Sequence, residues 1–185
     1  STPASQLSCG NTGFPTVYSD SLTNQGYDYA YGAGVRIGWV GQLTSALSVG
    51  ATAASKIYMT EFEDYEELFA EQGDFDIPAN YAVGLAVKMT PQATLAFDVQ
   101  YIDYEGVKSV SNAGPVPTAT GPGIGAGSGL LGSSSGLGFG WENMTIYKLG
   151  LNYEYNSQWT FRGGLNYGEG PIDESQVLFN VIAPG

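Results

Sequence analysis

The sequence contains no histidine, one cysteine, and only six lysine and arginine residues among 185. Without histidine, Ser-His-Asp and Cys-His catalysis and most zinc sites are excluded. Cys9 is alone and cannot form a disulfide within the chain. The net charge of −12 argues against a nucleic-acid partner, because phosphate groups are bound by clustered basic residues. We therefore expect a protein that is not an enzyme, has no cofactor and binds no nucleic acid.

The sequence also lacks a long hydrophobic run. No stretch approaches the roughly 20 consecutive apolar residues of a membrane-spanning helix. The strands of a membrane β-barrel alternate and escape such a criterion, so this class stays open. The N-terminus STPASQ has neither a start methionine nor the features of a signal peptide. We expect the chain to be a mature or excised piece of a longer protein.

Period-2 alternation of apolar with small or polar residues recurs six times, which predicts six β-strands. The alternating runs are 29–42, 47–59, the two halves of 81–101, 142–155 and 159–167. Large apolar side chains occupy the odd-numbered positions of these runs. The predicted organisation is a single β-barrel-type fragment: a loop over 1–26, four strands over 27–105, a Gly/Ser-rich loop over 106–140, two strands over 141–168 and a loop over 169–185.

The connections between these strands fall into two classes. Those at 43–46, 90–93 and 156–158 are short and polar, and they alternate with long ones at 60–76 and 106–140. The acidic segment 60–76 contains good helix formers and predicts one short helix. Short turns on one rim and long loops on the other are typical of an outer-membrane β-barrel, whereas a soluble sandwich has no reason to sort its loops. We expect an all-β, antiparallel up-and-down meander of about six long strands.

Charged side chains follow the strand parity. The strand runs contain five basic residues, all at even positions: Arg36, Lys56, Lys88, Lys148 and Arg162. Asp98 and Gln100 share this parity, which predicts a polar face turned to the lumen and an apolar face turned outward. Two interpretations of these lumen residues remain open. They form a salt-bridge network with Asp98 and Glu154, or one or two of them contact the carboxylate of a ligand.

The loop 60–76 carries two further candidate sites. Its eight carboxylates fit a solvated outer loop, and the alternative is a divalent-cation site that bridges to lipopolysaccharide phosphates. This weak metal candidate comprises Glu63, Asp64, Glu66 and Glu67. The apolar residues of the same loop form either a self-packed helix or an entry groove for a hydrophobic ligand; they are Phe62, Tyr65, Leu68 and Phe69.

Two motif matches have no supporting context. Gly132–Gly136 matches G-x-S-x-G, yet a nucleophile elbow requires a histidine and a strand-turn-helix setting. Gly127, Gly129 and Gly132 match G-x-G-x-x-G within a low-complexity loop that has no βαβ pattern. We attribute both matches to the glycine-rich composition.

Two long stretches resemble the FadL/TodX family of outer-membrane transporters for long-chain fatty acids and other hydrophobic compounds. The first reads GDFDIPANYAVGLAVKMTPQATLAFDVQYIDYEGVKSV, with D-I-P opening a strand, a T-P turn and D-x-Q-Y on the return strand. The second reads GFGWENMTIYKLGLNYEYNSQWTFRGGLNYGEGPIDESQVLFNVIAPG and includes the G-P-I and F-N-x-x-A-P-G phrases. The resemblance covers about residues 27–112 and 138–185.

The resemblance implies a barrel of about 14 strands whose lumen is plugged by an N-terminal hatch. It also implies uptake of fatty acids or other hydrophobic molecules, which enter from outside, bind in the lumen and leave sideways through the wall. Outer-membrane lipid and hydrophobic small molecules are then the expected partners, and the bacterial outer membrane is the expected location. The chain departs from the family pattern because it has six clear strands and no recognisable hatch or kinked strand.

Six strands of a wider barrel leave two unpaired edges, which lipid does not tolerate. The edges must pair with missing parts of the same polypeptide, with another chain or with copies of this one. An alternative function follows from the last case. The excised fragment would act as an extracellular structural protein that self-assembles through its open β-edges into an oligomer or filament.

Overall fold

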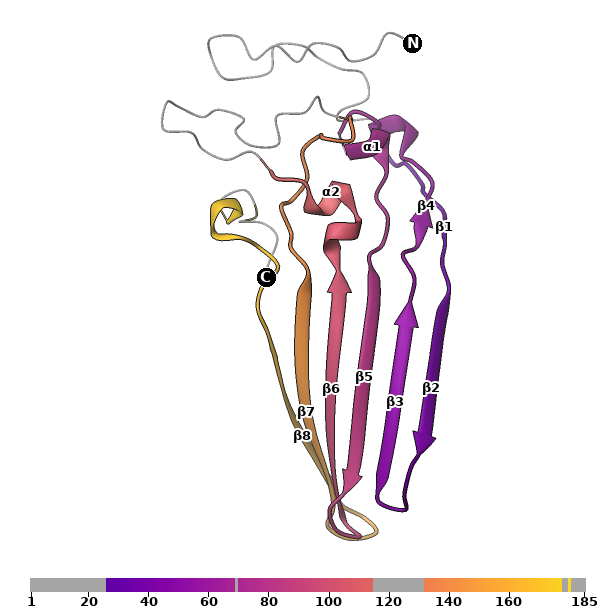
Figure 1. Cartoon of the computed structure of the whole chain (residues 1–185), viewed down its shortest axis with the longest axis vertical. Helices are drawn as coiled ribbons and strands as arrows, with labels where there is room; N and C mark the ends of the chain where they lie inside the picture. The colour runs from indigo at the N-terminus through magenta and orange to yellow at the C-terminus, as the bar shows by residue number, and fades with distance from the viewer. Residues whose placement is uncertain (1–25, 69, 115–131, 178–179, 181–185) are drawn as a thin grey trace.

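The computed structural model describes residues 26–68, 70–114, 132–177 and 180. Its main element is a six-stranded antiparallel sheet with the strand order β2-β3-β5-β6-β7-β8. These strands are Arg36–Gln42 (β2), Leu47–Ala54 (β3), Ala79–Lys88 (β5), Ala93–Asp103 (β6), Met144–Glu154 (β7) and Thr160–Gly168 (β8). A separate short pair joins β1 (Gly32–Ala33) to β4 (Tyr58–Met59), above β2 and β3 in Figure 1.

Five short helical segments accompany the sheet. They are η1 (Glu63–Tyr65), α1 (Ala70–Gly73), η2 (Tyr104–Gly106), α2 (Lys108–Ser111) and η3 (Glu174–Gln176). The segments α1 and α2 lie beyond the upper ends of the strands, where the long connections run (Figure 1). No helix in the described residues is long and apolar enough to cross a membrane.

The predicted six-stranded meander is confirmed, and so is the sorting of its connections by length. The three short turns lie together at the lower end in Figure 1. Each begins with a side-chain oxygen that accepts two backbone N–H groups: Thr44 from residues 46 and 47, Thr90 from residues 92 and 93, and Asn156 from residues 158 and 159. Such side chains replace the strand ladder locally and stop the strand.

The first two predicted strands are each interrupted, which the alternation did not predict. The ladder between them breaks at Ser55, whose hydroxyl oxygen accepts the N–H of Val35 at 3.0 Å. Ile57 stays opposite Ile77 in the β3–β5 register, through two backbone hydrogen bonds of 3.0 and 3.1 Å, whereas the pairing with the first segment shifts by one residue, from Arg36 opposite Ala54 to Ala33 opposite Tyr58. A competing side-chain acceptor and this one-residue shift in register therefore interrupt the strand after Ala54, so Lys56 lies outside any strand.

The long connections also differ from expectation. In the acidic loop, η1 and the four-residue α1 replace a helix around residues 66–70, and Glu71 and Gln72 adopt positive φ angles of 58° and 62°. The segments 106–140 and 169–185, predicted to be loops, contain α2 and η3. These short turns are stabilised by contacts distant in sequence, which a local propensity does not detect.

The register of the six-stranded sheet places every odd position beside an odd position. One row across the sheet comprises Trp39, Ala51, Val83, Val99, Tyr147 and Tyr167. Within the described residues this apolar face is uncovered, since Val83 is 59% and Leu165 77% exposed. The largest fully buried side chain is instead Val107, at the loop end. Hence the sheet is not built around a protein core on its apolar side.

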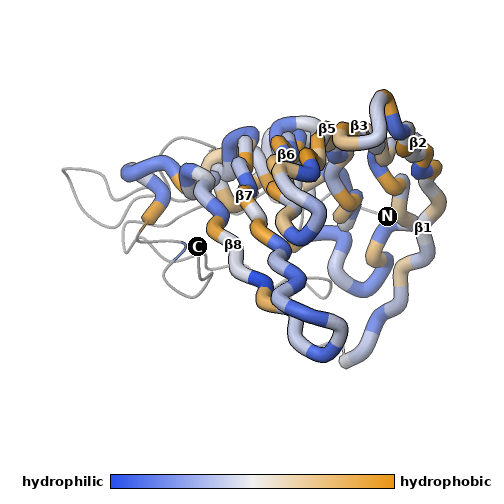
Figure 2. The backbone as a smooth tube through the Cα atoms, turned by 90° about the horizontal axis from the view of Figure 1, so that it is seen from below, coloured by the Kyte–Doolittle hydropathy of each residue, from blue (hydrophilic) through white to orange (hydrophobic). Residues whose placement is uncertain are grey.

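Viewed along the strands, the sheet bends into an open arc (Figure 2). Its edges in the described part of the chain are β2 and β8. The even-numbered side chains form the second face, on which the polar residues lie. The long loops and the helices lie beyond the upper ends of the strands in Figure 1, and the first candidate site is there.

Candidate functional site

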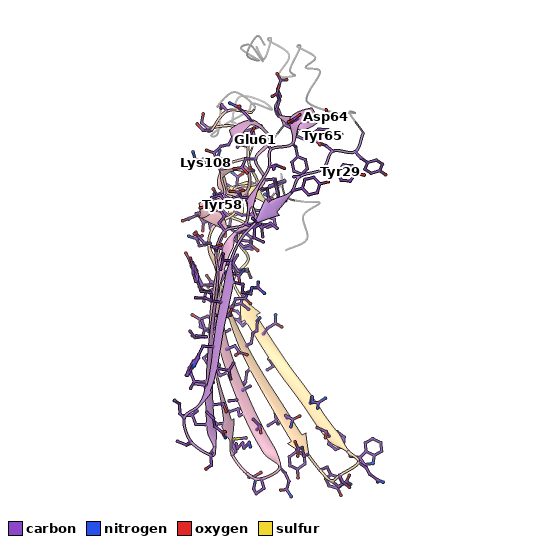
Figure 3. The ribbon with its side chains drawn as sticks, turned by 90° about the vertical axis from the view of Figure 1, so that its right-hand side faces the viewer. Tyr29, Tyr58, Glu61, Asp64, Tyr65 and Lys108 are labelled. Carbon is purple, nitrogen blue, oxygen red and sulfur yellow. The ribbon has the colours of Figure 1, made fainter. Side chains whose placement is uncertain are left out.

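A groove of about 450 Å³ lies at the loop end of the sheet. We call it the rim groove, and its lining residues are Gly26, Tyr27, Asp28, Phe62, Tyr65, Leu68 and Phe75. Three of the four predicted entry-groove residues are thus brought together, while Phe69 lies outside the described residues. In Figure 3, Tyr65 and Asp64 stand at the loop end, well away from the sheet turns.

Two side chains hold the walls of the rim groove together. The carboxylate of Asp28 accepts the N–H of Tyr29 at 2.6 Å and the N–H of Asp64 at 3.1 Å. The Tyr65 hydroxyl donates to the carbonyl of Gly26 at 2.8 Å. These contacts connect the segment before β1 to η1, across more than 30 residues of sequence. The ring of Tyr65 is thereby fixed as a wall of the groove.

Gly73 allows the chain to return against the other wall. Its φ is +90°, and a Cβ at this position would lie 2.6 Å from the carbonyl oxygen of Phe62. The N–H of Phe62 donates to the carbonyl of Gly73 at 3.0 Å, which closes the return. Only glycine combines this backbone conformation with this close approach.

Lys56, which the sequence predicts to face the lumen, is an ion-paired residue at the loop end of the sheet. Its Nζ lies 2.6 Å from Asp76 Oδ2 and donates to the Gly106 carbonyl at 3.4 Å. Burial alone would lower the pKa of Lys56, but its hydrogen bond to Asp76 and the neighbouring carboxylates raise it overall. Asp76 Oδ1 also accepts the N–H of Met59 at 2.7 Å. The pair therefore joins three separate segments.

Asp74 is the carboxylic acid of this region whose pKa is raised. Burial, together with the charge of Asp76 and a hydrogen bond to it, raises the pKa of Asp74 to about 6. Burial also acts to raise the pKa of Asp76, yet the hydrogen bonds from Lys56 and Met59 lower it overall. The two carboxyls thus titrate on opposite sides of their ordinary value. The Ser109 hydroxyl donates to the Asp74 carbonyl, so α2 packs on the same segment.

The G-x-S-x-G match at 132–136 supports the acidic loop through backbone hydrogen bonds. Residues 132 and 133 accept the backbone N–H groups of Gln72 and Glu71 at 2.7 and 3.1 Å. Lys108 of α2 forms a 2.9 Å ion pair with Glu71 from the same side. The segment 132–136 therefore fixes the left-handed turn of α1.

The polar face of the sheet carries the other predicted lumen residues. Lys148 Nζ donates to Gln100 Oε1 at 2.8 Å, and Arg162 Nε donates to Asn152 Oδ1 at 2.9 Å. Asp98 is the register partner of Lys148, yet no ion pair forms between them. A Cβ on Gly84 would collide with Asp98 Oδ1, so the Asp98 carboxylate lies over the bare backbone of Gly84.

Among the described residues, the predicted salt-bridge network does not form on this face. The two ion pairs found in the part of the chain that the structure describes are Lys56–Asp76 and Lys108–Glu71, both at the loop end. Arg36 and Lys88 occupy opposite ends of the polar face, at the start of β2 and the end of β5. Lys148 and Arg162 are therefore hydrogen-bonded to side-chain amides. Arg36 and Lys88 form no ion pair within the described residues.

A second hollow, of about 410 Å³, lies on the sheet between β2 and β6. On the polar face its lining consists mainly of small residues: Gly38, Ser48, Gly50, Thr52, Ala82, Gly84, Ala86 and Ala96. Asp98 is its one charged lining residue. Small side chains in four adjacent strands leave this space.

The weak metal candidate does not gain support from the geometry. Glu63 and Asp64 belong to η1, and Glu66 and Glu67 follow it. Among the residues described, no group of three or more acidic or cysteine side chains could hold a metal ion.

Sequence reasoning missed half of the rim groove. It did not single out Tyr27, Asp28 and Phe75, and it treated Asp74 and Asp76 as part of a solvated run. The aromatic residues flanking the acidic loop were a usable signal for Tyr27 and Phe75. No local signal marks Asp28, because its partner Asp64 is 36 residues away.

Comparison with solved structures finds a hydrocarbon channel and a toluene transporter among the similar proteins. A "CymD monoaromatic hydrocarbon channel" is 19% identical with a TM-score of 0.48, covering 75% of this chain and 38% of the channel. The Pseudomonas putida toluene transporter TodX gives 17% identity and a TM-score of 0.47, covering 80% of this chain and 38% of TodX. The chain thus spans less than two-fifths of each of these proteins. No curated protein matches.

The comparison with protein families gives a match over most of the chain. The model described as "Outer membrane protein transport protein (OMPP1/FadL/TodX)" matches residues 18–181. The resemblance inferred from the two long sequence stretches is thereby confirmed. Since the match extends over most of the sequence, the chain belongs to the OMPP1/FadL/TodX family of outer-membrane transport proteins, which are not enzymes.

Proposed function

We propose that the chain forms part of the wall and entrance of a passive channel for hydrophobic compounds. The observation that carries this proposal is the two-faced sheet with an aromatic groove at its loop end. Its odd face exposes Val83, Leu165 and their neighbours, while its even face bears Lys148, Asp98 and Gln100. A strand wall with lipid on one side and a polar lumen on the other has this pattern.

In this proposal the rim groove receives uncharged hydrophobic ligands from the outside, and carboxylates are received by the basic residues of the polar face. Aromatic and aliphatic side chains of the groove exclude water from an apolar molecule, which drives its binding without any covalent step. The hollow floored by glycine and alanine then offers space along the polar face. The ligand moves down its concentration gradient. Such passive transfer requires no catalytic or energy-coupling site.

Long-chain fatty acids are the proposed ligands with the clearest anchor on this chain. The strands of the polar face carry Arg36, Lys88, Lys148 and Arg162, against Asp98 and Glu154. Lys148 and Arg162 are held by neutral amides, so their charge remains available to a carboxylate. Lys56 is already paired with Asp76 and is not part of this anchor.

Uptake by the protein reconstituted in liposomes tests the proposal. We expect passage of both oleate and a neutral hydrophobic compound such as toluene. The double variant Lys148→Ala/Arg162→Ala should slow oleate several-fold and leave toluene unchanged, since only the anion uses the two cations. Lys108→Ala is the matched control, because Lys108 lies outside the sheet. Failure of both compounds to pass would refute the channel, and an equal loss for both would refute the fatty-acid anchor.

A second function is supported by the two open edges of the sheet. Strands β2 and β8 each have one strand neighbour in the described residues, so their outer backbone groups can pair with copies of this chain. Self-assembly of this polypeptide would give large particles or filaments without detergent. Electron microscopy and sedimentation separate this outcome from a discrete detergent-bound species, which supports the channel.

A further inference from the structure

Among the described residues, the lining of the rim groove contains no basic side chain. The one charged lining residue in this part of the chain is Asp28, whose two oxygens accept backbone N–H groups from Tyr29 and Asp64. These hydrogen bonds fix the carboxylate in place and leave its negative charge intact. A ligand that enters the groove therefore meets aromatic rings and a fixed negative charge.

The surrounding loop strengthens this negative field. Residues 61–76 contain eight carboxyl side chains. In the described part of the chain, Glu71 and Asp76 are the members of this set that form ion pairs, with Lys108 and Lys56. The other four basic residues of the sequence lie on β2, β5, β7 and β8. The loop therefore holds far more negative than positive charge around the groove.

Four aromatic side chains line the same groove: Tyr27, Phe62, Tyr65 and Phe75. The faces of such rings carry partial negative charge and attract cations, including ammonium groups of ligands. Rings and carboxylate thus favour the same kind of ligand. We propose that the rim groove is a binding site for hydrophobic organic cations, such as aryl or alkyl ammonium compounds, and selects them over carboxylate anions of equal size.

The alternative ligand classes fit the groove less well. A carboxylate anion loses hydration beside Asp28 and gains no lysine or arginine partner in the lining. A neutral compound keeps the apolar contacts but gains nothing from the charge. The order of affinity is therefore cation, then neutral molecule, then anion.

This inference rests on the proposed function only in treating the groove as the channel entrance. It concerns binding, which is measured without transport. If toluene fails to pass through liposomes while the cation still binds preferentially, the channel proposal is refuted and the site stands. If toluene passes and the cation has no preference, the site is refuted and the channel stands.

Three probes of similar shape and different charge test the site by titration calorimetry on the protein in nonionic detergent: benzyltrimethylammonium, benzyl alcohol and phenylacetate. We expect the cation to bind at least about tenfold more tightly than the anion, with the alcohol between them. Added salt should weaken binding of the cation and leave the alcohol unchanged. Equal affinities, tighter binding of phenylacetate or no binding of any probe would overturn the proposal.

Two variants locate the binding. Phe62→Leu removes one ring of the groove and should weaken the cation more than the alcohol. Phe161→Leu, an exposed ring on β8, is its control and should change neither affinity. Should Phe62→Leu fail to fold, the variant Glu61→Gln/Glu63→Gln changes two exposed side chains and should lower only the affinity for the cation. A preference for the cation that survives both variants would place it elsewhere and overturn the site.

Discussion

Lys56 Nζ and Asp76 Oδ2 lie 2.6 Å apart, and this pair joins the end of β3 to the segment that leads into β5. The Asp76 side chain is 4% exposed and the Lys56 side chain 27%. Asp76 also accepts the N–H of Met59 next to the β1–β4 pair. One carboxylate thereby fixes the position of the loop that builds the rim groove.

Removal of Lys56 should destabilise the rim. Lys56→Met leaves Asp76 buried without its cation, and breaking such a pair costs about 3 kcal/mol. Urea unfolding in detergent measures the loss. Lys108→Met is the control, because the Lys108 and Glu71 side chains are 48% and 36% exposed and an exposed pair contributes less than about 1 kcal/mol. Equal losses for the two variants would show that the Lys56 pair has no special role.

Asp74 should make stability depend on pH between its ordinary pKa and its pKa in the folded protein. Burial beside Asp76 raises the pKa from 3.8 to about 6, so the folded state retains a proton that the unfolded chain releases. The contribution of Asp74 to folding is therefore complete below pH 3.8 and is lost as the pH rises through about 6.

Asp74→Asn should remove this dependence and make the protein more stable than the wild type at neutral pH. Thermal unfolding measured across the pH range checks both effects. Asp173→Asn is the control, because hydrogen bonds from Ser175 lower the pKa of Asp173 below 3.8. The effect of this substitution on stability is therefore expected at a lower pH than that of Asp74→Asn. An unchanged slope in Asp74→Asn would contradict the assignment to Asp74.

Neighbouring positions on β5 should respond oppositely to charge. Val83 is 59% exposed on the odd face, and Val83→Lys places an ammonium group against lipid at a cost of about 2–4 kcal/mol near the midplane. Ala82 points to the even face between Thr52 and Gln100, so Ala82→Lys should be tolerated. Yield of folded protein in the membrane and unfolding in detergent-free liposomes measure the difference. Similar behaviour of the two variants would reverse or abolish the assignment of faces.

Gly73→Ala should disturb the rim groove. The positive φ and the close approach to Phe62 make an alanine strained by about 1–3 kcal/mol. The matched control is Gly163→Ala in β8, where a Cβ would have nothing within 4 Å. Unfolding free energy and binding of benzyl alcohol should both fall in Gly73→Ala alone. If the unfolding free energy and the binding of benzyl alcohol are both unchanged in Gly73→Ala, residue 73 does not require the positive φ that only glycine adopts easily.

The six-stranded sheet was largely predictable from the sequence. In 81–101 the alternation placed Val83, Leu85 and Phe97 on one face, and the register β5–β6 confirms this arrangement. The turn at Thr90 was also recognisable, because a hydroxyl after a strand captures the next N–H groups. Both signals are local, with neighbours two to four residues apart, and a β-strand imposes its period on any sequence that forms it.

The rim was not predictable in the same way. Lys56 continued the polar parity and was assigned to the lumen, yet Ser55 ended the strand and Asp76 captured the charge. The short helices of the long loops form against distant segments, as α1 does against residues 132–133. Local propensity carries no information on such partners.

The sequence by itself therefore determined the six strands of the main sheet, their order and which face is apolar, because these properties repeat with the period of the backbone. Only the tertiary structure decided that Asp28, Phe62 and Phe75 line one groove and that Lys56 anchors it. Those contacts depend on where the loops return in space. Loop return is set by single features such as the positive φ of Gly73 and the buried carboxylate of Asp76, which leave no periodic trace in the chain.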